Sequence, residues 1–189
     1  MQFSKNSLRK KFIKERKNKY LKAKNLDFKI IFKLIKKNFL NNKIIIAGYY
    51  PSNYEVNIIE FFKLACEKNF KLALPVISSS SKMSFRSWVY QEPLFISKFG
   101  TLEPNKRNKE VIPDLVLVPL VAFDNQLNRI GYGKGYYDRS LKKINKIKKK
   151  IVSLGIAYSF QKYDKIPTNK HDVKLDYILT ERGIIKSQQ

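Results

Sequence analysis

Glycines, cations and one carboxylate are concentrated between residues 129 and 139 of the 189-residue chain. Three of the seven glycines lie within residues 131–135, with Arg129 and Lys134 beside them and Asp138 just after them. Glycine lets backbone N–H groups approach an anion closely, and the two cations would add positive charge to the same concavity. The segment therefore predicts a site for a phosphate or a nucleotide.

The spacing of these glycines differs from that of the two common phosphate-binding motifs. Residues 129–135 fit neither Gly-x-x-x-x-Gly-Lys-Ser/Thr nor Gly-x-Gly-x-x-Gly. A generic glycine-rich turn would explain the glycines by themselves. The presence of cations, tyrosine rings and a carboxylate in the same turn favours the phosphate or nucleotide site.

A strand and a helix are expected on the two sides of this loop. Residues 114–119 form an apolar, β-branched run that ends at a proline, which is typical of a buried strand. A helix is expected from about residue 135 to 149, with Leu141, Ile144 and Ile147 on its buried side. Proteins of the α/β class bind ligands where a strand passes into a helix in this way.

The chain before the loop predicts two helices and a βαβ unit. The expected elements are helices over 4–25 and 27–39, a strand over 44–50, a helix opening at Glu55, a strand over 71–76, a flexible serine loop over 78–81, antiparallel strands over 83–90 and 94–96, and an exposed loop over 105–110. The helix after Glu55 is expected to bury Ile58, Ile59, Phe62 and Cys66.

The remaining residues predict two more strands, over 151–156 and 175–180, and a frayed tail after Gly183. The loop between these strands contains His171 and Asp172. Taken together, the elements predict one domain over residues 1–189: a three-layer α/β/α arrangement with a mostly parallel, twisted, Rossmann-like open sheet. The ligand should lie over the carboxyl ends of the strands.

Lysine and arginine outnumber aspartate and glutamate by 39 to 15, which gives the chain a formal net charge of +24. Such a charge suits nucleic acid, an anionic membrane surface or a polyanionic small molecule, and composition does not choose among them. A general bias toward lysine is the simplest main cause, because the basic residues are spread along several expected helices.

The cysteine content and the hydropathy of the chain indicate in which cellular compartment it works. Cys66 is the single cysteine, which excludes an intrachain disulfide and a cysteine-rich metal site. No apolar run approaches the roughly 18 residues that a membrane span needs, and the N-terminus is charged where a signal peptide is apolar. We expect a cytoplasmic protein that has no membrane partner and acts as a monomer.

Several short motifs resemble, in order and spacing, those of the 5-formyltetrahydrofolate cyclo-ligase family, also called methenyltetrahydrofolate synthetases. The matching motifs are Lys5-x-x-Leu8-Arg9, Tyr50-Pro51 with Glu55-Val56, Gly100-x-x-Glu103-Pro104, Val118-Pro119, Ala122-Phe123-Asp124, the run from Arg129 to Arg139, and His171-Asp172 with Asp176. The resemblance covers nearly the whole chain.

The resemblance implies an enzyme of one-carbon metabolism that uses ATP and Mg²⁺. Such enzymes close 5-formyltetrahydrofolate to 5,10-methenyltetrahydrofolate and release ADP and phosphate. The formyl oxygen must be phosphorylated before the N10 amine can close the ring, so the site needs positioning and charge neutralisation more than a covalent nucleophile. The implied partners are ATP and 5-formyltetrahydrofolate, and nucleic acid is not an expected partner.

The resemblance also implies a role for each matching residue. Arg129 and Lys134 would be catalytic, and Asp138 and Asp172 would bind Mg²⁺, a cation that prefers carboxylate oxygen. ATP would be bound by Lys5, Arg9, Arg129, Ile130, Gly131, Tyr132, Gly133, Lys134, Gly135, Tyr136 and Tyr137. The folate would be bound by Tyr50, Glu55, Tyr132, Gly133, Lys134, Gly135 and Tyr136, with tyrosine faces for the pterin and Glu55 as an acceptor for its N–H donors.

Other interpretations stay open at this point. Lys5 and Arg9 could be helix surface, Asp138 could cap the following helix, and Tyr136 or Tyr137 could be a packing aromatic. At the level of the whole chain, the alternatives are a basic RNA-binding protein on an α/β scaffold and a relative that uses the ATP site on another substrate.

The chain departs from the family pattern at two positions. Leu120 stands where many relatives have a small residue, and Tyr132 stands where some members have arginine. The second departure removes a cation that could reach phosphate or the folate tail. Both departures bear on substrate affinity more than on the type of reaction.

Overall fold

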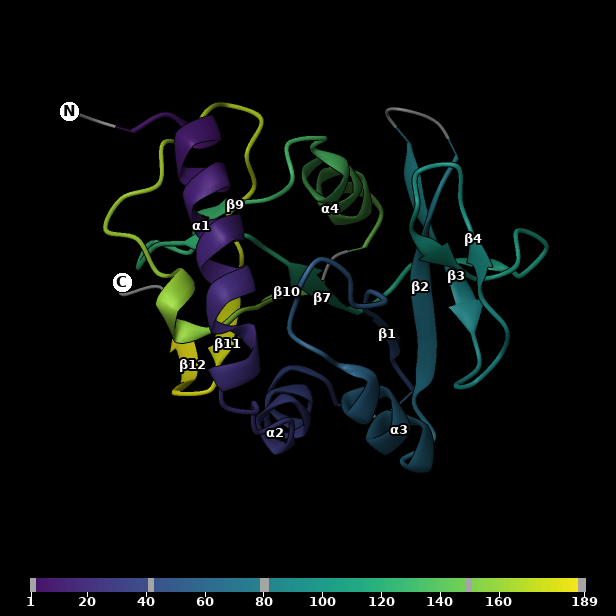
Figure 1. The fold of residues 1–189 in the computed structure, drawn as a ribbon. Helices are drawn as coiled ribbons and strands as arrows, with labels where there is room; N and C mark the ends of the chain where they lie inside the picture. Colours follow the sequence, from purple (N-terminus) through teal and green to yellow (C-terminus); the bar gives the residue numbers. More distant parts are fainter. Residues whose placement is uncertain (1–2, 41–42, 79–81, 149–150, 187–189) are drawn as a thin grey trace.

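An eight-stranded, mostly parallel sheet organises the computed structural model, which describes residues 3–40, 43–78, 82–148 and 151–186 (Figure 1). The strand order is β12-β11-β10-β7-β1-β2-β3-β6. Parallel pairing joins β11 (Tyr177–Thr180), β10 (Val152–Ile156), β7 (Leu115–Pro119), β1 (Ile45–Ala47) and β2 (Lys71–Ile77). Antiparallel pairing adds β12 (Gly183–Lys186), β3 (Met83–Trp88) and β6 (Glu110–Val111) at the edges. The predicted α/β class with a mostly parallel open sheet is confirmed.

The order of the parallel strands determines where a ligand can bind. Numbered among themselves along the chain, they are arranged 2-1-3-4-5, one of the two common doubly wound orders. The winding direction reverses between β1 and β7, so the chain leaves a crevice outside the carboxyl ends of these two strands.

Helices cover both faces of this sheet. The helices are α1 (Lys5–Lys19) with the short 3₁₀ turn η1 (Tyr20–Lys22), α2 (Lys29–Asn38), α3 (Ile59–Glu67), α4 (Tyr136–Ile147) and the 3₁₀ turn η2 (Ser159–Gln161). Figure 1 shows α4 on one side of β7 and β10, with α2 on the other side. None of the helices that the structure describes is long and apolar enough to span a membrane.

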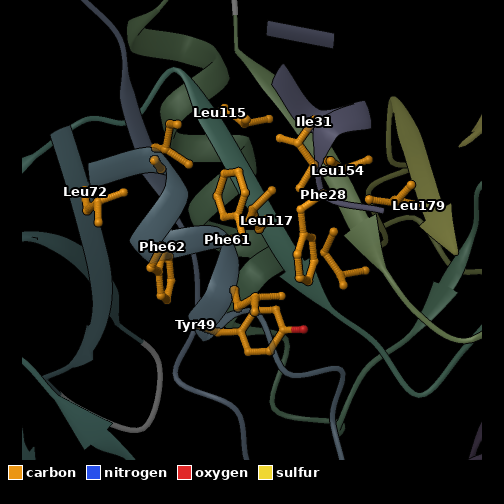
Figure 2. Packing of buried hydrophobic residues seen from close by; sticks show 14 of the residues in the cluster. Phe28, Ile31, Tyr49, Phe61, Phe62, Leu72, Leu115, Leu117, Leu154 and Leu179 are labelled. Carbon is orange, nitrogen blue, oxygen red and sulfur yellow. The ribbon is translucent and has the colours of Figure 1, made fainter. Parts of the chain in front are cut away.

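The alternation of side chains along β7 builds two separate cores. Successive strand residues point to opposite faces of a sheet. Leu115 and Leu117 belong to the apolar cluster formed with α2 and α3, part of which Figure 2 shows around Phe61. Val116 and Val118 belong to the cluster that includes Leu141 of α4.

Two short hairpins stand outside the main sheet. One pairs β4 (Phe95–Ile96) with β5 (Leu102–Glu103), and the other pairs β8 (Ala122–Phe123) with β9 (Arg129–Ile130). Helix α1 packs on the second hairpin through an apolar cluster that contains Leu8, Phe12 and Ile130. The sequence analysis missed the second hairpin, although it carries Arg129.

The helix expected to open at Glu55 begins at Ile59 instead. Residues 52–55 form a turn that is closed by a hydrogen bond from the backbone N–H of Glu55 to the carbonyl of Ser52 at 2.9 Å, with Asn53 and Tyr54 at positive φ values of 48° and 61°. The buried face consists of Ile58, Phe61, Phe62 and Ala65. Cys66 is exposed, so its predicted burial was wrong, because it lies about 90° around the helix from the centre of this face.

Two further predictions near helix α4 and the C-terminus were wrong. Ile147, the last residue of α4, is 55% exposed. Residues 183–186 are not frayed, because they form β12 and pair with β11, with Gly183 turning the chain at φ 111°. Residues 79–81 of the predicted serine loop, 149–150 of the predicted helix and 187–189 of the predicted tail lie outside the described residues.

Candidate active site

A cavity of about 650 Å³ lies over the carboxyl ends of β1, β2 and β7. It is lined by α1, by the loop after β1, by the end of β2, by the loop that enters α4 and by the loop before β11. Each residue predicted to bind ATP, folate or Mg²⁺ lines it: Lys5, Arg9, Tyr50, Glu55, Arg129, Ile130, Gly131, Tyr132, Gly133, Lys134, Gly135, Tyr136, Tyr137, Asp138 and Asp172. The fold thus brings together segments from both ends of the chain.

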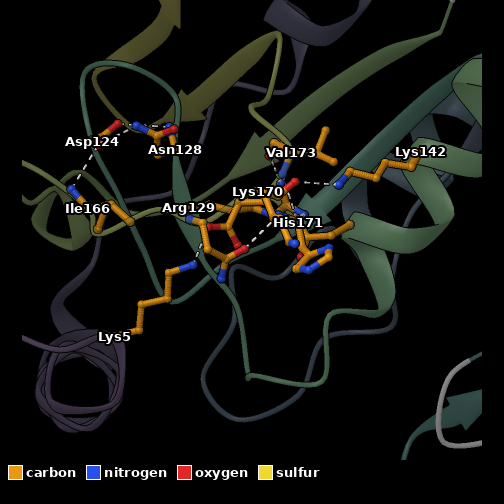
Figure 3. Close-up of polar contacts among 12 residues, drawn as sticks. Lys5, Asp124, Asn128, Arg129, Lys142, Ile166, Lys170, His171 and Val173 are labelled. Carbon is orange, nitrogen blue, oxygen red and sulfur yellow. Dashed lines mark hydrogen bonds and ion pairs between the residues drawn. The ribbon is translucent and has the colours of Figure 1, made fainter.

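The hairpin turn between β8 and β9 fixes the position of Arg129. Asp124 is buried, and its Oδ1 accepts hydrogen bonds from the backbone N–H groups of Gln126 at 3.0 Å and Asn128 at 2.9 Å. Its Oδ2 accepts from the backbone of Ile166 at 3.0 Å, which ties the turn to a distant loop (Figure 3). The Ala-Phe-Asp motif therefore supports the site rather than lining it.

Arg129 is a buried cation at the floor of the cavity, with 8% of its surface exposed. Its Nη2 lies 2.7 Å from Oδ1 of Asp138, and its Nη1 donates to the carbonyl of Val173 at 2.5 Å. Burial lowers the pKa of the guanidinium, while the charges of Asp138 and Asp172 act in the opposite direction. Asp138 also accepts from the backbone N–H of Val173 at 3.0 Å, so it joins α4 to the late loop.

The second predicted metal-binding carboxylate is held by the N-terminal helix. Lys5 forms an ion pair with Asp172 (Figure 3 shows Lys5), and each side chain is 25% exposed. Asp172 also accepts from the backbone of Asn169 at 2.6 Å. Lys142 of α4 donates to the carbonyl of Lys170 at 3.1 Å and holds the same loop from the other side.

The glycine loop is shaped around two arginine side chains. Arg9 donates from Nε to the carbonyl of Gly131 at 2.7 Å, and a Cβ added to Gly133 would lie 3.3 Å from Cζ of Arg9. Gly133 has φ +98°, and Gly135, at φ +65°, is the N-cap of α4. A Cβ on Gly135 would lie 2.9 Å from Nη1 of Arg139, so a side chain at either position would be strained by the positive φ and would press on an arginine side chain.

The loop after β1 holds Glu55 in a buried position, 6% exposed. Its Oε2 accepts a hydrogen bond from the backbone N–H of Ser52 at 2.9 Å. Burial raises the pKa of the Glu55 carboxyl group, whereas the Ser52 hydrogen bond, the charge of Arg16 and the hydroxyl of Tyr132 favour its ionised form. Burial also raises the pKa of Tyr132 to about 12, so this hydroxyl stays protonated near neutral pH.

The arrangement offers cations, free N–H groups at the start of α4 and two carboxylates on one side of the cavity. Helix N-termini bind phosphate, and Mg²⁺ is held in nucleotide sites by one or two carboxylates together with phosphate oxygens. Asp138 and Asp172 fit that donor set, although the described residues contain no group of three potential metal ligands. On the other side, Tyr50, Glu55 and Tyr132 offer aromatic faces and one acceptor.

Comparison of the chain with known proteins supports the same assignment as the geometry of the cavity. A model of the 5-formyltetrahydrofolate cyclo-ligase family matches residues 1–181 of the chain. The chain belongs to this family. The resemblance expected from the motifs and the expectation of an enzyme of this family are confirmed.

Relatives within the cyclo-ligase family cover most of the chain. The 5-formyltetrahydrofolate cyclo-ligase of Mycoplasma pneumoniae is 36% identical over 182 residues, which cover 94% of this chain and 98% of the relative. That of Haemophilus influenzae is 33% identical over 140 residues, which cover 71% and 74% of the two chains. The structure of the Aquifex aeolicus 5,10-methenyltetrahydrofolate synthetase superimposes with a TM-score of 0.74 at 28% identity, covering 98% of this chain and 93% of that chain.

A buried arginine beside this cavity escaped the sequence analysis. Arg16 of α1 is only 1% exposed and donates to the carbonyls of Leu120 at 3.2 Å and Asn53 at 2.6 Å. It also donates to the hydroxyl of Tyr132, and its Cζ lies 5.5 Å from the centre of that ring. The sequence analysis assigned Arg16 to the solvated surface of the helix. The available signal was its position, because it continues the Leu8 and Phe12 stripe at i+4 intervals.

The two tyrosines at the start of α4 have different surroundings in this cyclo-ligase. Tyr137 packs against the apolar cluster on the α4 face of the sheet, and burial strongly raises its pKa. The guanidinium of Arg139 lies over the ring of Tyr136, 5.5 Å from its centre. Both rings line the cavity, so a packing role for Tyr137 is compatible with a contact to a ligand.

Proposed function

We propose that the chain catalyses the ATP- and Mg²⁺-dependent cyclisation of 5-formyltetrahydrofolate to 5,10-methenyltetrahydrofolate, with release of ADP and phosphate. The observation that carries this proposal is one cavity in which the glycine loop, the cations, two carboxylates and Glu55 meet. The names of the cyclo-ligases that this chain resembles support the choice of reaction.

The cations on the glycine-loop side suit the transfer of a phosphoryl group. In the proposed reaction, the formyl oxygen attacks the γ-phosphorus of ATP and ADP leaves. The N10 amine then attacks the formyl carbon, the carbon–oxygen bond to phosphate breaks, and N10 loses its proton. Arg129 and Lys134 would neutralise charge on the transferred group, while Lys5, Arg9 and the N–H groups of the loop would hold the remaining phosphates.

Asp138 and Asp172 would hold the metal ion. When bound, Mg²⁺ supplies charge neutralisation between the phosphates. Arg129 and Lys5 pair with these carboxylates and fix their orientation. The residues present therefore fit a Mg²⁺-nucleotide.

Glu55 and the tyrosines would hold the folate. A buried carboxylate is a strong acceptor for the N–H donors of a pterin ring, and tyrosine faces suit a flat heterocycle. Residues 132–136 would border both ligands as one shared wall, because they line the cavity from Tyr132, near Glu55, to Tyr136, the first residue of α4. This shared wall would bring the formyl group to the γ-phosphate.

The test is a spectrophotometric assay of the purified chain with 5-formyltetrahydrofolate, ATP and Mg²⁺. We expect the absorbance of methenyltetrahydrofolate to appear, with one ADP formed per product. Omission of ATP or removal of Mg²⁺ by a chelator should abolish the signal. Protein that is folded by circular dichroism and still shows no product would contradict the proposal, and turnover of another formylated amine would favour a relative with a different substrate.

A monomeric state and a cytoplasmic location are part of the same proposal. Light scattering coupled to size-exclusion chromatography should give the mass of one chain. A mass of two chains at assay concentrations would exclude the monomer without affecting the assignment of the reaction.

A further inference from the structure

Helix α1 carries a buried cation, Arg16, next to the proposed folate side of the cavity, which is formed by Tyr50, Glu55 and Tyr132. An arginine side chain has five N–H donors and stays charged, so its burial is costly unless its donors find acceptors. Arg16 donates to two backbone carbonyls and to the hydroxyl of Tyr132. Within the described ranges of the chain, no carboxylate forms an ion pair with it.

Tyr132 connects this buried cation to the cavity. One face of its ring meets the guanidinium of Arg16, its hydroxyl accepts from Nη2, and 39% of the residue is exposed. The carboxylate of Glu55 is near enough to this hydroxyl for its charge to raise the pKa of Tyr132. Arg16 therefore contacts the ring that lines the cavity, and it acts on Glu55 through that ring and through its own charge.

We propose that Arg16 is a positioning residue for folate binding, which fixes the ring of Tyr132 and keeps a positive charge behind the carboxylate of Glu55. This inference rests on the proposed function, since it takes Glu55 as the acceptor for the pterin N–H donors. Arg16 itself does not line the cavity, so its effect on the substrate passes through Tyr132 and Glu55.

The charged and titratable groups around Glu55 indicate how the positioning role of Arg16 can be measured. Arg16 of α1 and Tyr132 of the glycine loop act on this carboxylate, whose charge in turn helps to raise the pKa of Tyr49 after β1 and of Tyr137 of α4. Arg16 is the cation whose charge lowers the pKa of Glu55 against the effect of burial. Loss of that charge should raise this pKa further, so the ionised acceptor would be lost at a higher pH.

The main test compares Arg16→Met with the unchanged chain. Methionine keeps an unbranched side chain and removes the charge and all donors. We expect the KM for 5-formyltetrahydrofolate to rise about tenfold or more, because a buried charged hydrogen-bond network is broken, while the KM for ATP changes less than about twofold. The acid limb of the kcat/KM profile for the folate should move to higher pH.

Two other variants separate charge from geometry. Arg16→Lys keeps the positive charge but cannot reproduce the contacts of arginine with the carbonyls of Leu120 and Asn53 and with the Tyr132 hydroxyl. The acid limb of the pH profile should therefore return toward that of the unchanged chain, while the folate KM stays raised. Tyr132→Phe removes the connecting hydroxyl. If the proposal holds, the combined effect of Arg16→Met and Tyr132→Phe on the folate KM is smaller than the product of the single effects.

Lys17→Met is the matched control, because Lys17 is the next residue of the same helix and is exposed. It should leave both KM values and the pH profile unchanged. An Arg16→Met protein that is folded but has an unchanged folate KM and acid limb would overturn the inference while the proposed function stands. Equal increases of both KM values would also overturn it, because they would indicate a merely structural role.

Direct binding separates failure of the inference from failure of the proposed function. The Kd for 5-formyltetrahydrofolate without ATP can be measured by quenching of protein fluorescence. If the unchanged chain binds the folate but lacks turnover, the proposed reaction fails and the Kd ratio for Arg16→Met decides the inference. If Arg16→Met does not fold, Arg16→Lys and Tyr132→Phe provide the same comparison, and unaltered folate binding in both would overturn the proposal.

Discussion

The two sides of the cavity hold their charges in different ways. On the glycine-loop side, Arg129 pairs directly with Asp138, Lys5 pairs with Asp172, and both carboxylates are partly exposed. On the proposed folate side, formed by Tyr50, Glu55 and Tyr132, the charges of Arg16 and Glu55 are more deeply buried than those two carboxylates and meet through neutral groups, namely backbone atoms and the Tyr132 hydroxyl.

This difference has a physical consequence for each side. Carboxylates that are partly exposed, as Asp138 and Asp172 are, can exchange a protein partner for a metal ion at modest cost. Buried charges held by neutral groups cannot rearrange so readily, because each lost hydrogen bond leaves an unsatisfied polar atom. The glycine-loop side is therefore suited to a ligand that brings its own charge, and the folate side to a ligand recognised by shape and hydrogen bonds.

The largest effect is expected for Asp138→Asn on the glycine-loop side. The amide keeps the shape of the side chain but removes the charge that Mg²⁺ would need, so kcat/KM should fall by about a hundredfold or more. The Mg²⁺ concentration required for half-maximal rate should rise as well. The exchange also unpairs buried Arg129 and should reduce the free energy of unfolding by about 1 kcal/mol.

Asp138→Asn is checked by a magnesium titration of the initial rate together with denaturant unfolding. Asp164→Asn, an exposed residue outside the cavity, is the control. A normal rate at low Mg²⁺ would remove Asp138 from the metal site.

A smaller effect is expected for Gly133→Ala on the same side. The added Cβ would press on the guanidinium of Arg9, and alanine is strained at φ +98°. The KM for ATP should rise about tenfold, with a loss of about 1 kcal/mol in stability. Gly100→Ala is a useful comparison, because its φ is also positive at +74° but it has open space around it. If both variants changed the KM for ATP equally, the contact with Arg9 would not be the cause.

The smallest effect on stability is expected for Glu55→Gln on the folate side, and it should have the opposite sign. The pKa of Glu55 is raised in the folded chain, so folding disfavours the charged form. Near neutral pH the variant should unfold at a Tm equal to or slightly above that of the original. Below the ordinary pKa of 4.5 the carboxyl group is neutral in both states, and this difference should vanish.

Glu55→Gln should impair activity, although it does not lower stability. The folate KM should rise by about tenfold or more, because the amide presents a weaker acceptor to the pterin. Tm measurements at several pH values, combined with kinetics, check both parts. A clear loss of Tm near neutral pH would indicate that Glu55 stabilises the fold, and the contrast between the two sides would then be lost.

Much of the fold and the cavity lining could be predicted from the sequence. The central strands were found because both of their faces are covered, which requires continuous apolar runs such as 115–118. The residues of the cavity were found because their types and order match a family whose motifs are specific. Lys5 and Asp172, far apart in sequence, were expected to meet for that reason alone.

Two of the missed features lack a local signal, and the third, Arg16, had one that its charge outweighed. The strands β8 and β9 have two residues each, too few to show an alternating pattern. The turn before α3 places Asn53 and Tyr54 at positive φ values, which neither residue type requires. Arg16 was assigned to the surface by its charge, although its spacing from Leu8 and Phe12 placed it on the buried stripe. In each case tertiary contacts decided the outcome.

The ion pair between Lys5 and Asp172 joins residues that are 167 positions apart. Contacts of such separation form late, because the intervening chain must already be in place. During synthesis on the ribosome, the glycine loop and α4 emerge well before the loop that carries Asp172. A nascent chain therefore has the glycine loop before it has both of the carboxylates that are proposed to bind Mg²⁺. On the proposed function, turnover would begin only after the loop that carries Asp172 has reached Lys5 of α1, so the onset of activity would report a late step of folding.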